Sequence, residues 1–192
     1  MQEITVVEKQ VEIMADKHEI AVFAGGCFWC TEAVFSQLKG VLMVVPGYAG
    51  GHTANPTYRE VCTDSTGHSE AVRIQFDPDQ VNYKRLLNVF FETHDPTTLN
   101  RQGADRGTHY RSMVLYADDG QKEQAEAYIK ELDSSGSLKD PVVTEVVPLE
   151  NFYEAEDDHH QFYLNNPDQM YCQLVIQPKV EKVRGHFAEN LR

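Results

Sequence analysis

The residue with the most evident chemistry is a cysteine, Cys27, in the stretch Gly25-Gly26-Cys27-Phe28-Trp29-Cys30. An apolar run over 20–24 precedes the turn and a helical pattern follows it, so the spacing predicts a strand, a sharp glycine turn and a helix. The unpaired N–H groups and the dipole at a helix N-terminus favour an anion, and they lower the pKa of a thiol placed there. We therefore expect Cys27 to be a thiolate nucleophile.

Three further cysteines, Cys30, Cys62 and Cys172, limit what this thiol could do. Cys27 and Cys30 form a C-x-x-C pair, a spacing found in zinc sites and in disulfide oxidoreductases. A structural zinc ion needs four ligands, and no second pair exists, although a mixed site with His68 is conceivable. Disulfide exchange remains an enzymatic alternative, and a redox-sensing protein without catalysis is the non-enzymatic one.

Acyl transfer by a cysteine would need a histidine as its base. The chain has eight histidines, but no motif connects His52 or the pair His159-His160 to the nucleophile. We expect these histidines to lie at the surface or to cap turns.

A carboxyl group and two phenols offer a second kind of chemistry. Glu70 begins an alternating apolar run, and Tyr58 and Tyr110 lie in segments rich in glycine, proline and polar residues. Together they could donate hydrogen bonds to one oxygen atom. The apolar faces of Phe28 and Trp29, next to the nucleophile, would hold a small alkyl group. Donors that face an oxygen and aromatic rings that face a small alkyl group would suit a sulfoxide.

The elements that must position these residues follow from hydrophobic periodicity. Strands are predicted over 20–24, 41–45, 70–76, 112–116 and 142–147, and helices over 28–38, 82–93 and 121–132. The segment from Pro46 to Pro56 has the composition of turns, and 94–110 is predicted to be a loop of functional length. Interleaved strands and helices with alternating patterns predict a two-layer α+β domain.

Composition sets the class of protein. The 192 residues carry a net charge of −13, which argues against nucleic acid as a partner, and 41% of them are hydrophobic, as in a globular domain. No apolar run approaches the roughly 18 residues that a membrane span requires. The first residues, Met1–Glu19, lack the apolar centre of a signal peptide. A soluble cytoplasmic protein is therefore expected.

Several motifs together resemble the peptide methionine sulfoxide reductase A family. These are Gly26-Cys27-Phe28-Trp29, Gly47-Tyr48-Ala49-Gly50-Gly51, 55–62, 66–72, Phe76-Asp77-Pro78, His94-Asp95-Pro96-Thr97, 101–107, Tyr110-Arg111-Ser112, 152–156 and Asn166-Pro167. The resemblance runs in unbroken order over Glu19–Cys172. It divides the chain into an N-terminal appendage over 1–18, a catalytic domain over 19–172 and a C-terminal tail over 173–192.

The resemblance implies a two-layer α/β sandwich around a mixed sheet, with a ferredoxin-like core and long coil extensions. It also implies reduction of the S epimer of methionine sulfoxide, free or in proteins, which repairs oxidative damage. A sulfenic acid forms on the nucleophile, condenses with a second cysteine to a disulfide, and thioredoxin reduces that disulfide. We expect no bound cofactor or metal, and a monomer that uses thioredoxin as its external dithiol.

The family's site residues carry over position by position. The resemblance implies Cys27 as nucleophile and Glu70 as general acid, Tyr58 and Tyr110 as phenols that bind the sulfoxide oxygen, Asp105 as a buried acid that fixes the site, and Phe28 and Trp29 as walls around the methyl group. Because the oxygen must be protonated or strongly hydrogen-bonded, Glu70 is expected to have a raised pKa.

The chain departs from the family's simplest pattern at Cys30, where many members have glycine. Residues three apart share a helix face, and their separation suits a disulfide, so Cys30 is a candidate resolving cysteine. Cys172 follows Asn166-Pro167, where many members keep a resolving cysteine on a mobile tail. Both candidates stay open, as does a relay between them. Cys62 is expected to be a small buried residue.

Overall fold

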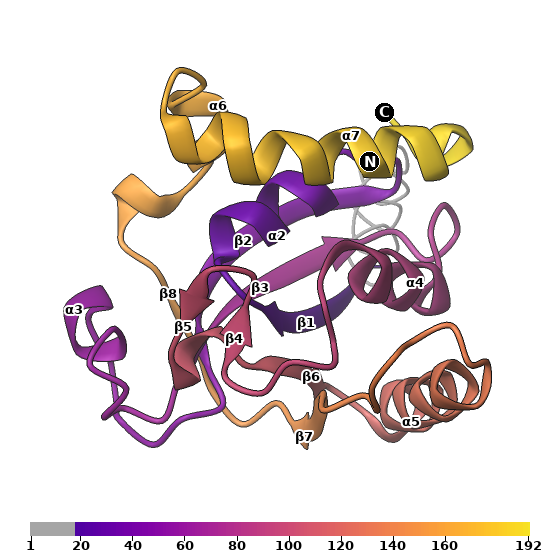
Figure 1. Ribbon diagram of the computed structural model, residues 1–192, viewed down its shortest axis with the longest axis horizontal. Coiled ribbons are helices and arrows are strands. Elements are labelled where there is room, and N and C mark those ends of the chain that lie inside the picture. Colours follow the sequence, from indigo (N-terminus) through magenta and orange to yellow (C-terminus); the bar gives the residue numbers. More distant parts are fainter. Residues whose placement is uncertain (1–17) are drawn as a thin grey trace, which may run out of the picture.

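The computed structural model describes residues 18–192 and contains a six-stranded sheet in the order β7-β6-β1-β3-β2-β8 (Figure 1). The strands are β1 (Glu19–Gly25), β2 (Val41–Ala49), β3 (Ser69–Phe76), β6 (Ser112–Tyr116), β7 (Glu145–Pro148) and β8 (Phe152–Glu154). All neighbouring strands are antiparallel except β6 and β7, which run parallel. The predicted mixture of helices with a mixed sheet is confirmed.

The α-helices within residues 18–192 are α2 (Phe28–Phe35), α3 (Tyr58–Val61), α4 (Tyr83–Thr93), α5 (Asp119–Ser134), α6 (Phe162–Asn165) and α7 (Gln177–His186). Of these, α2, α4 and α5 pack against the strands, whereas α6 and α7 pack on α2. The chain runs β1-α2-β2-β3-α4-β6 through its centre, and α2, α4 and α7 contribute to the same buried cluster as β1 and β3. A smaller cluster on the other face is built from short side chains of β1, β2 and β3 and longer ones of β6.

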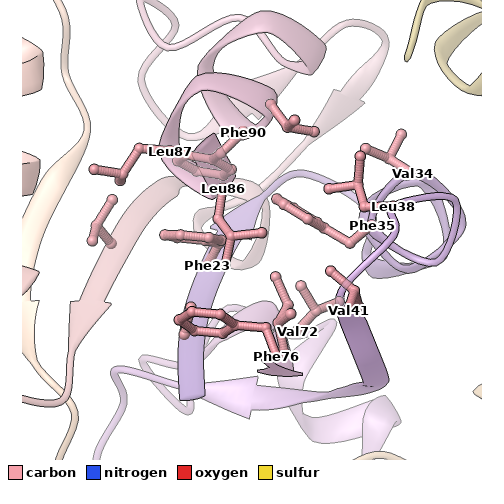
Figure 2. Packing of buried hydrophobic residues seen from close by; sticks show 14 of the residues in the cluster. Phe23, Val34, Phe35, Leu38, Val41, Val72, Phe76, Leu86, Leu87 and Phe90 are labelled. Atoms are coloured by element: carbon pink, nitrogen blue, oxygen red, sulfur yellow. The ribbon is translucent and has the colours of Figure 1, made fainter. Parts of the chain in front are cut away.

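The main core fixes α2 against the sheet. Figure 2 shows Phe23 of β1 between Phe35 of α2 and Phe90 of α4, and the ring centroids are 5.6 and 4.8 Å apart, respectively. Each of these rings is fully buried, and burial of one such side chain contributes about 1.5–3 kcal/mol. The C-terminal end of α2, where Phe35 lies, is therefore held against β1.

The prediction of turns from Pro46 onward is wrong at its beginning, because β2 continues through Ala49. The carbonyl of Pro46 accepts a hydrogen bond from Ala155 N, so its nitrogen points to the same side of the strand. That side is where β8 has ended at Glu154, and the proline therefore interrupts no ladder bond. The loop predicted over 94–110 contains a short hairpin, β4 (Arg101–Gln102) and β5 (Asp105–Arg106).

The C-terminal residues predicted as a tail over 173–192 form a packed helix. A π-helical turn, Cys172–Ile176, leads directly into α7. Val183 and Phe187 lie in the main core, and Leu191 forms a β-bridge with Leu38. The N-terminal appendage predicted over 1–18 lies outside the described residues except for His18.

Within residues 18–192, the helices lack the combination of length and apolar character that crossing a bilayer requires.

Candidate active site

Cys27 lies at the junction of β1 and α2, as its flanking residues predict. It is the N-cap residue of α2, directly after a glycine with positive φ. Gly26 has φ +88°, and a Cβ at this position would lie 2.5 Å from Cγ of Gln102. Glycine is therefore required here both by the backbone and by the neighbouring hairpin.

The charge state of Cys27 differs from the prediction. Burial raises the pKa of this thiol well above its ordinary value, and the hydrogen bond with Cys30 and the charge of Glu70 raise it further. The expected lowering by the helix N-terminus is thus wrong for the reduced protein, because desolvation outweighs the field of a short helix. Cys27 rests as a thiol.

Three cysteines share one buried cluster. Cys27, Cys30 and Cys172 pack together with small and branched apolar side chains, and each thiol is free. Cys172 has 0% exposure. The hydrogen bond from Cys27 lowers the pKa of Cys30 to about 7 against the opposing effect of burial, and the positive charge of Lys179 lowers it as well. The hydrogen bond with Cys27 and the charge of Lys179 thus both favour the thiolate form of Cys30.

Glu70 lies on β3 beside the first turn of α2. Its side chain is 1% exposed, and its Oε2 accepts a hydrogen bond from Phe28 N at 3.0 Å. Burial raises the pKa of Glu70 to about 8, although this hydrogen bond opposes the shift. Glu70 thus holds a proton near neutral pH, as a general acid must.

The two phenols are placed by short helical turns. Tyr58 is the first residue of α3, whose start is fixed by a capping box between Thr57 and Glu60. Tyr110 ends a 3-10 turn, Thr108–Tyr110. Burial and the charge of Glu70 raise the pKa of both tyrosines, and Cys27 contributes to each shift. Both hydroxyl groups therefore stay protonated and can donate.

Phe28 and Trp29 occupy different environments. Phe28 is buried in the main core, where its ring stacks on Tyr58 at 6.3 Å. Trp29 is half-buried, and its ring lies parallel to that of Phe162 at 3.7 Å and 7°. Of the two expected walls of the methyl pocket, Trp29 is the more accessible one.

Asp105, expected to be buried, is half-buried in β5. Its Oδ2 accepts a hydrogen bond from the hydroxyl of Tyr171 at 2.9 Å, and that hydroxyl lies 3.9 Å from Sγ of Cys30. Tyr171 was not predicted as a site residue. Only its position next to Cys172 in the sequence could have indicated it.

Two more residues at the site escaped the sequence analysis. His159 is 6% exposed, and its Nδ1 accepts a hydrogen bond from Trp29 Nε1 at 3.2 Å, so it is not the surface histidine that was one of the two expectations for it. Glu156 accepts hydrogen bonds from Tyr48 Oη at 2.6 Å and Tyr58 N at 2.8 Å. Against the effect of its partial burial, these bonds hold the pKa of Glu156 below its ordinary value. Glu156 ends the motif 152–156 of the family resemblance, which could have indicated it, whereas no motif marks His159.

The remaining candidates have other surroundings. His68 is buried, its Nδ1 accepts from Gly51 N at 3.0 Å and its Nε2 lies 2.7 Å from Thr53 O, so both ring nitrogens hold a loop. Cys62, expected to be buried, is exposed. Across the described part of the chain, no three His, Cys, Asp or Glu side chains are grouped as a metal would need.

Comparison with known proteins gives one family. The family model described as "Peptide methionine sulfoxide reductase" matches residues 19–191. The chain is 55% identical over 171 residues to the peptide methionine sulfoxide reductase MsrA of Natronomonas pharaonis, covering 89% of this chain and 96% of the relative.

Solved structures show the same likeness. The reduced form of Mxr1 from Saccharomyces cerevisiae has a TM-score of 0.74 at 29% identity and covers 82% of this chain and 90% of its own. Mxr1 in complex with Trx2 has a TM-score of 0.53 at 20% identity, over 77% and 86% of the two chains. At that identity the second likeness concerns the fold alone.

Proposed function

This chain belongs to the peptide methionine sulfoxide reductase family, and from that premise we propose that it reduces the S epimer of methionine sulfoxide, free or in proteins, to methionine. The enzyme is an oxidoreductase. The observation that carries the proposal is the buried Glu70, which keeps a proton to about pH 8 beside the helix turn of Cys27. A buried acid next to a thiol is what the reduction of a sulfoxide needs.

In the first step, the sulfoxide oxygen accepts hydrogen bonds from Glu70, Tyr58 and Tyr110. These bonds withdraw electrons from the sulfur, and Cys27 attacks it. The oxygen then passes to Cys27 as the S–O bond of the substrate and the bond between the two sulfurs break, and the proton of the thiol ends on this oxygen. Methionine is thereby released and Cys27 becomes a sulfenic acid. The atoms balance because Cys27 enters as a thiol.

The second step removes the oxygen as water. The Cys27 sulfenic acid condenses with the thiol of Cys30 to a disulfide. The hydrogen bond between the two cysteines supports Cys30 as the first resolving residue. Cys172, in the same buried cluster, then attacks Cys30 and returns Cys27 to its thiol form.

An external dithiol closes the cycle by reducing the disulfide between Cys30 and Cys172. We propose thioredoxin, on the strength of the family resemblance. Its dithiol is oxidised to a disulfide as both cysteines are returned to thiols, so electrons and protons balance.

At a finer level of fold, the succession β1-α2-β2-β3-α4-β6 with strand order β6-β1-β3-β2 supports the expected ferredoxin-like core.

An assay with separated S and R epimers of a blocked methionine sulfoxide, with dithiothreitol as reductant, tests the activity. We expect turnover of the S epimer and none of the R epimer, and loss of single-turnover methionine formation in Cys27→Ser. Reduction of insulin disulfides without sulfoxide turnover would instead identify a disulfide oxidoreductase.

A further inference from the structure

We propose that Phe162, held in place by Glu32, determines the specificity of the sulfoxide site by fixing the indole ring of Trp29. The inference rests on the proposed function, because it assigns the substrate's alkyl group to that ring. It assigns a role to two residues, Phe162 and Glu32, that are neither the nucleophile nor the acid nor one of the two phenols.

The first observation is how tightly the indole of Trp29 is held. Among the described residues, its stack with Phe162 has the shortest centroid distance and the smallest interplanar angle, 3.7 Å and 7°. The edge of the ring is fixed as well, since its Nε1 donates to His159 Nδ1. Tyr171 meets the indole edge-on at 6.0 Å. With one face covered and the edge bonded, the ring has little freedom to turn.

The second observation is that Phe162 is itself placed by a buried carboxylate. Glu32 is 4% exposed and lies on α2, three residues after Trp29, on the same side of the helix. Its Oε1 accepts a hydrogen bond from Gln161 N at 2.9 Å, and the carboxylate also accepts one from the backbone of Phe162. α2 therefore carries both the indole and the anchor of the ring that covers it.

The backbone at this anchor is strained, which argues for a role. Gln161 has φ +52° and ψ 32°, a left-handed conformation that a residue with a side chain rarely adopts. Burial raises the pKa of Glu32, so the carboxylate is also unfavourable without its two N–H partners. Strain and a buried acid persist together where surrounding contacts compensate for them.

A fixed indole sets the size of the alkyl pocket. A rigid apolar wall can separate substrates that differ by one methylene by roughly 10- to 200-fold. If the stack were lost, Trp29 would turn more freely and admit a larger group. Methyl sulfoxides would then lose their advantage over ethyl sulfoxides.

Blocked methionine and ethionine S-sulfoxides serve as the paired substrates, and Phe162→Ala and Phe162→Leu as the variants. Leu164→Ala, in the same short helix but 64% exposed, is the matched control. We expect the ratio of kcat/KM for methyl over ethyl to fall at least threefold in Phe162→Ala and less in Phe162→Leu, and to stay unchanged in the control. Trp29 is the only tryptophan, so its emission should shift to longer wavelength in Phe162→Ala.

Glu32 is tested by rescue. Glu32→Ala should reproduce the effects of Phe162→Ala on the ratio and the emission, while Glu32→Gln, which keeps an acceptor oxygen, should restore most of both. Normal methionine sulfoxide turnover with an unchanged ratio in Phe162→Ala and Phe162→Leu would overturn the inference. Absence of sulfoxide reduction in the unaltered enzyme would instead refute the proposed function, and the specificity with it.

Discussion

At the scale of single residues, burial has opposite effects on the reactivity of Glu70, the proposed acid, and Cys27, the proposed nucleophile. Desolvation raises the pKa of Glu70, so its carboxyl group keeps a proton near neutral pH and can donate it. The same desolvation raises the pKa of Cys27 and keeps it a thiol, which is less nucleophilic than a thiolate. The two shifts point in the same direction but have opposite consequences for reactivity.

Substitution of Glu70 by glutamine should slow single-turnover methionine formation by roughly two to four orders of magnitude, the scale of general acid catalysis. The amide keeps an oxygen for the N–H of Phe28, so the fold should persist. Glu150→Gln, an exposed acid on a loop, is the control. Rapid-quench kinetics measures the step, and a near-normal rate in Glu70→Gln would assign the acid elsewhere.

The pH dependence of that step follows from the sign of the shift. The pKa of Glu70 is raised to about 8, and the protonated form is the donor. The single-turnover rate should therefore fall as pH rises through about 8. Measured between pH 6 and 10, this descending limb should be absent from the residual rate of Glu70→Gln; a limb that survives the substitution belongs to another group.

Sequence could mark Cys27 and Glu70, the proposed nucleophile and acid, as candidates because local spacing and the family motifs point to them. It could not give the charge state of Cys27, because that depends on burial. Nor could it identify His159, which reaches Trp29 across 130 positions of the chain. Distant contacts leave no periodic signal in a single sequence.

At the scale of elements, α7 contributes one positive charge, that of Lys179, to the surroundings of Cys30. Lys179 lines a small cavity with Cys30 and His94, and its charge helps to lower the pKa of Cys30 to about 7. Lys179→Gln should shift the pH midpoint of iodoacetamide labelling at Cys30 upward, as read by mass spectrometry. Lys182→Gln is the matched control, because Lys182 donates instead to the carbonyl of Glu92. Equal midpoints in all three proteins would remove Lys179 from this role.

Strands and long helices could be predicted where one face is apolar, as in β3 and α4. The continuation of β2 through a proline and a glycine could not, because it depends on which side of the strand has a partner. The small strands of the site, β4 and β5, have two residues each, too few for periodicity to show.

For the molecule as a whole, the last helix is part of the core. Phe187 of the C-terminal segment is buried against the main cluster. Phe187→Ala should lower the free energy of unfolding by about 3 kcal/mol, as large-to-small core changes do. Leu174→Ala, at an exposed position, should stay within about 0.5 kcal/mol. Urea denaturation measures both, and equal stabilities would show that the C-terminal segment contributes little.

The overall architecture was predictable because interleaved strands and helices allow few arrangements of this size. Residues 173–192 were predicted as a tail, although Ile176, Val180, Val183 and Phe187 follow one another at intervals of three or four residues, the spacing of an amphipathic helix. This helix could therefore have been predicted. Its packing could not, because the surface that receives it is formed by α2 and α4.

The π-helical turn at Cys172–Ile176 has a mechanical consequence. A π turn contains one residue more than an α turn and is the less stable of the two. The segment in which Cys172 joins α7 therefore holds one residue more than an α-helix would need there. Tightening that turn would rotate the preceding residues by about 100° while α7 stays docked. The side chain of Cys172, which lies in the buried cluster with Cys27 and Cys30, would turn with these preceding residues. Hydrogen–deuterium exchange should accordingly be faster at 172–176 in the oxidised enzyme than in the reduced one, with α7 protected in both.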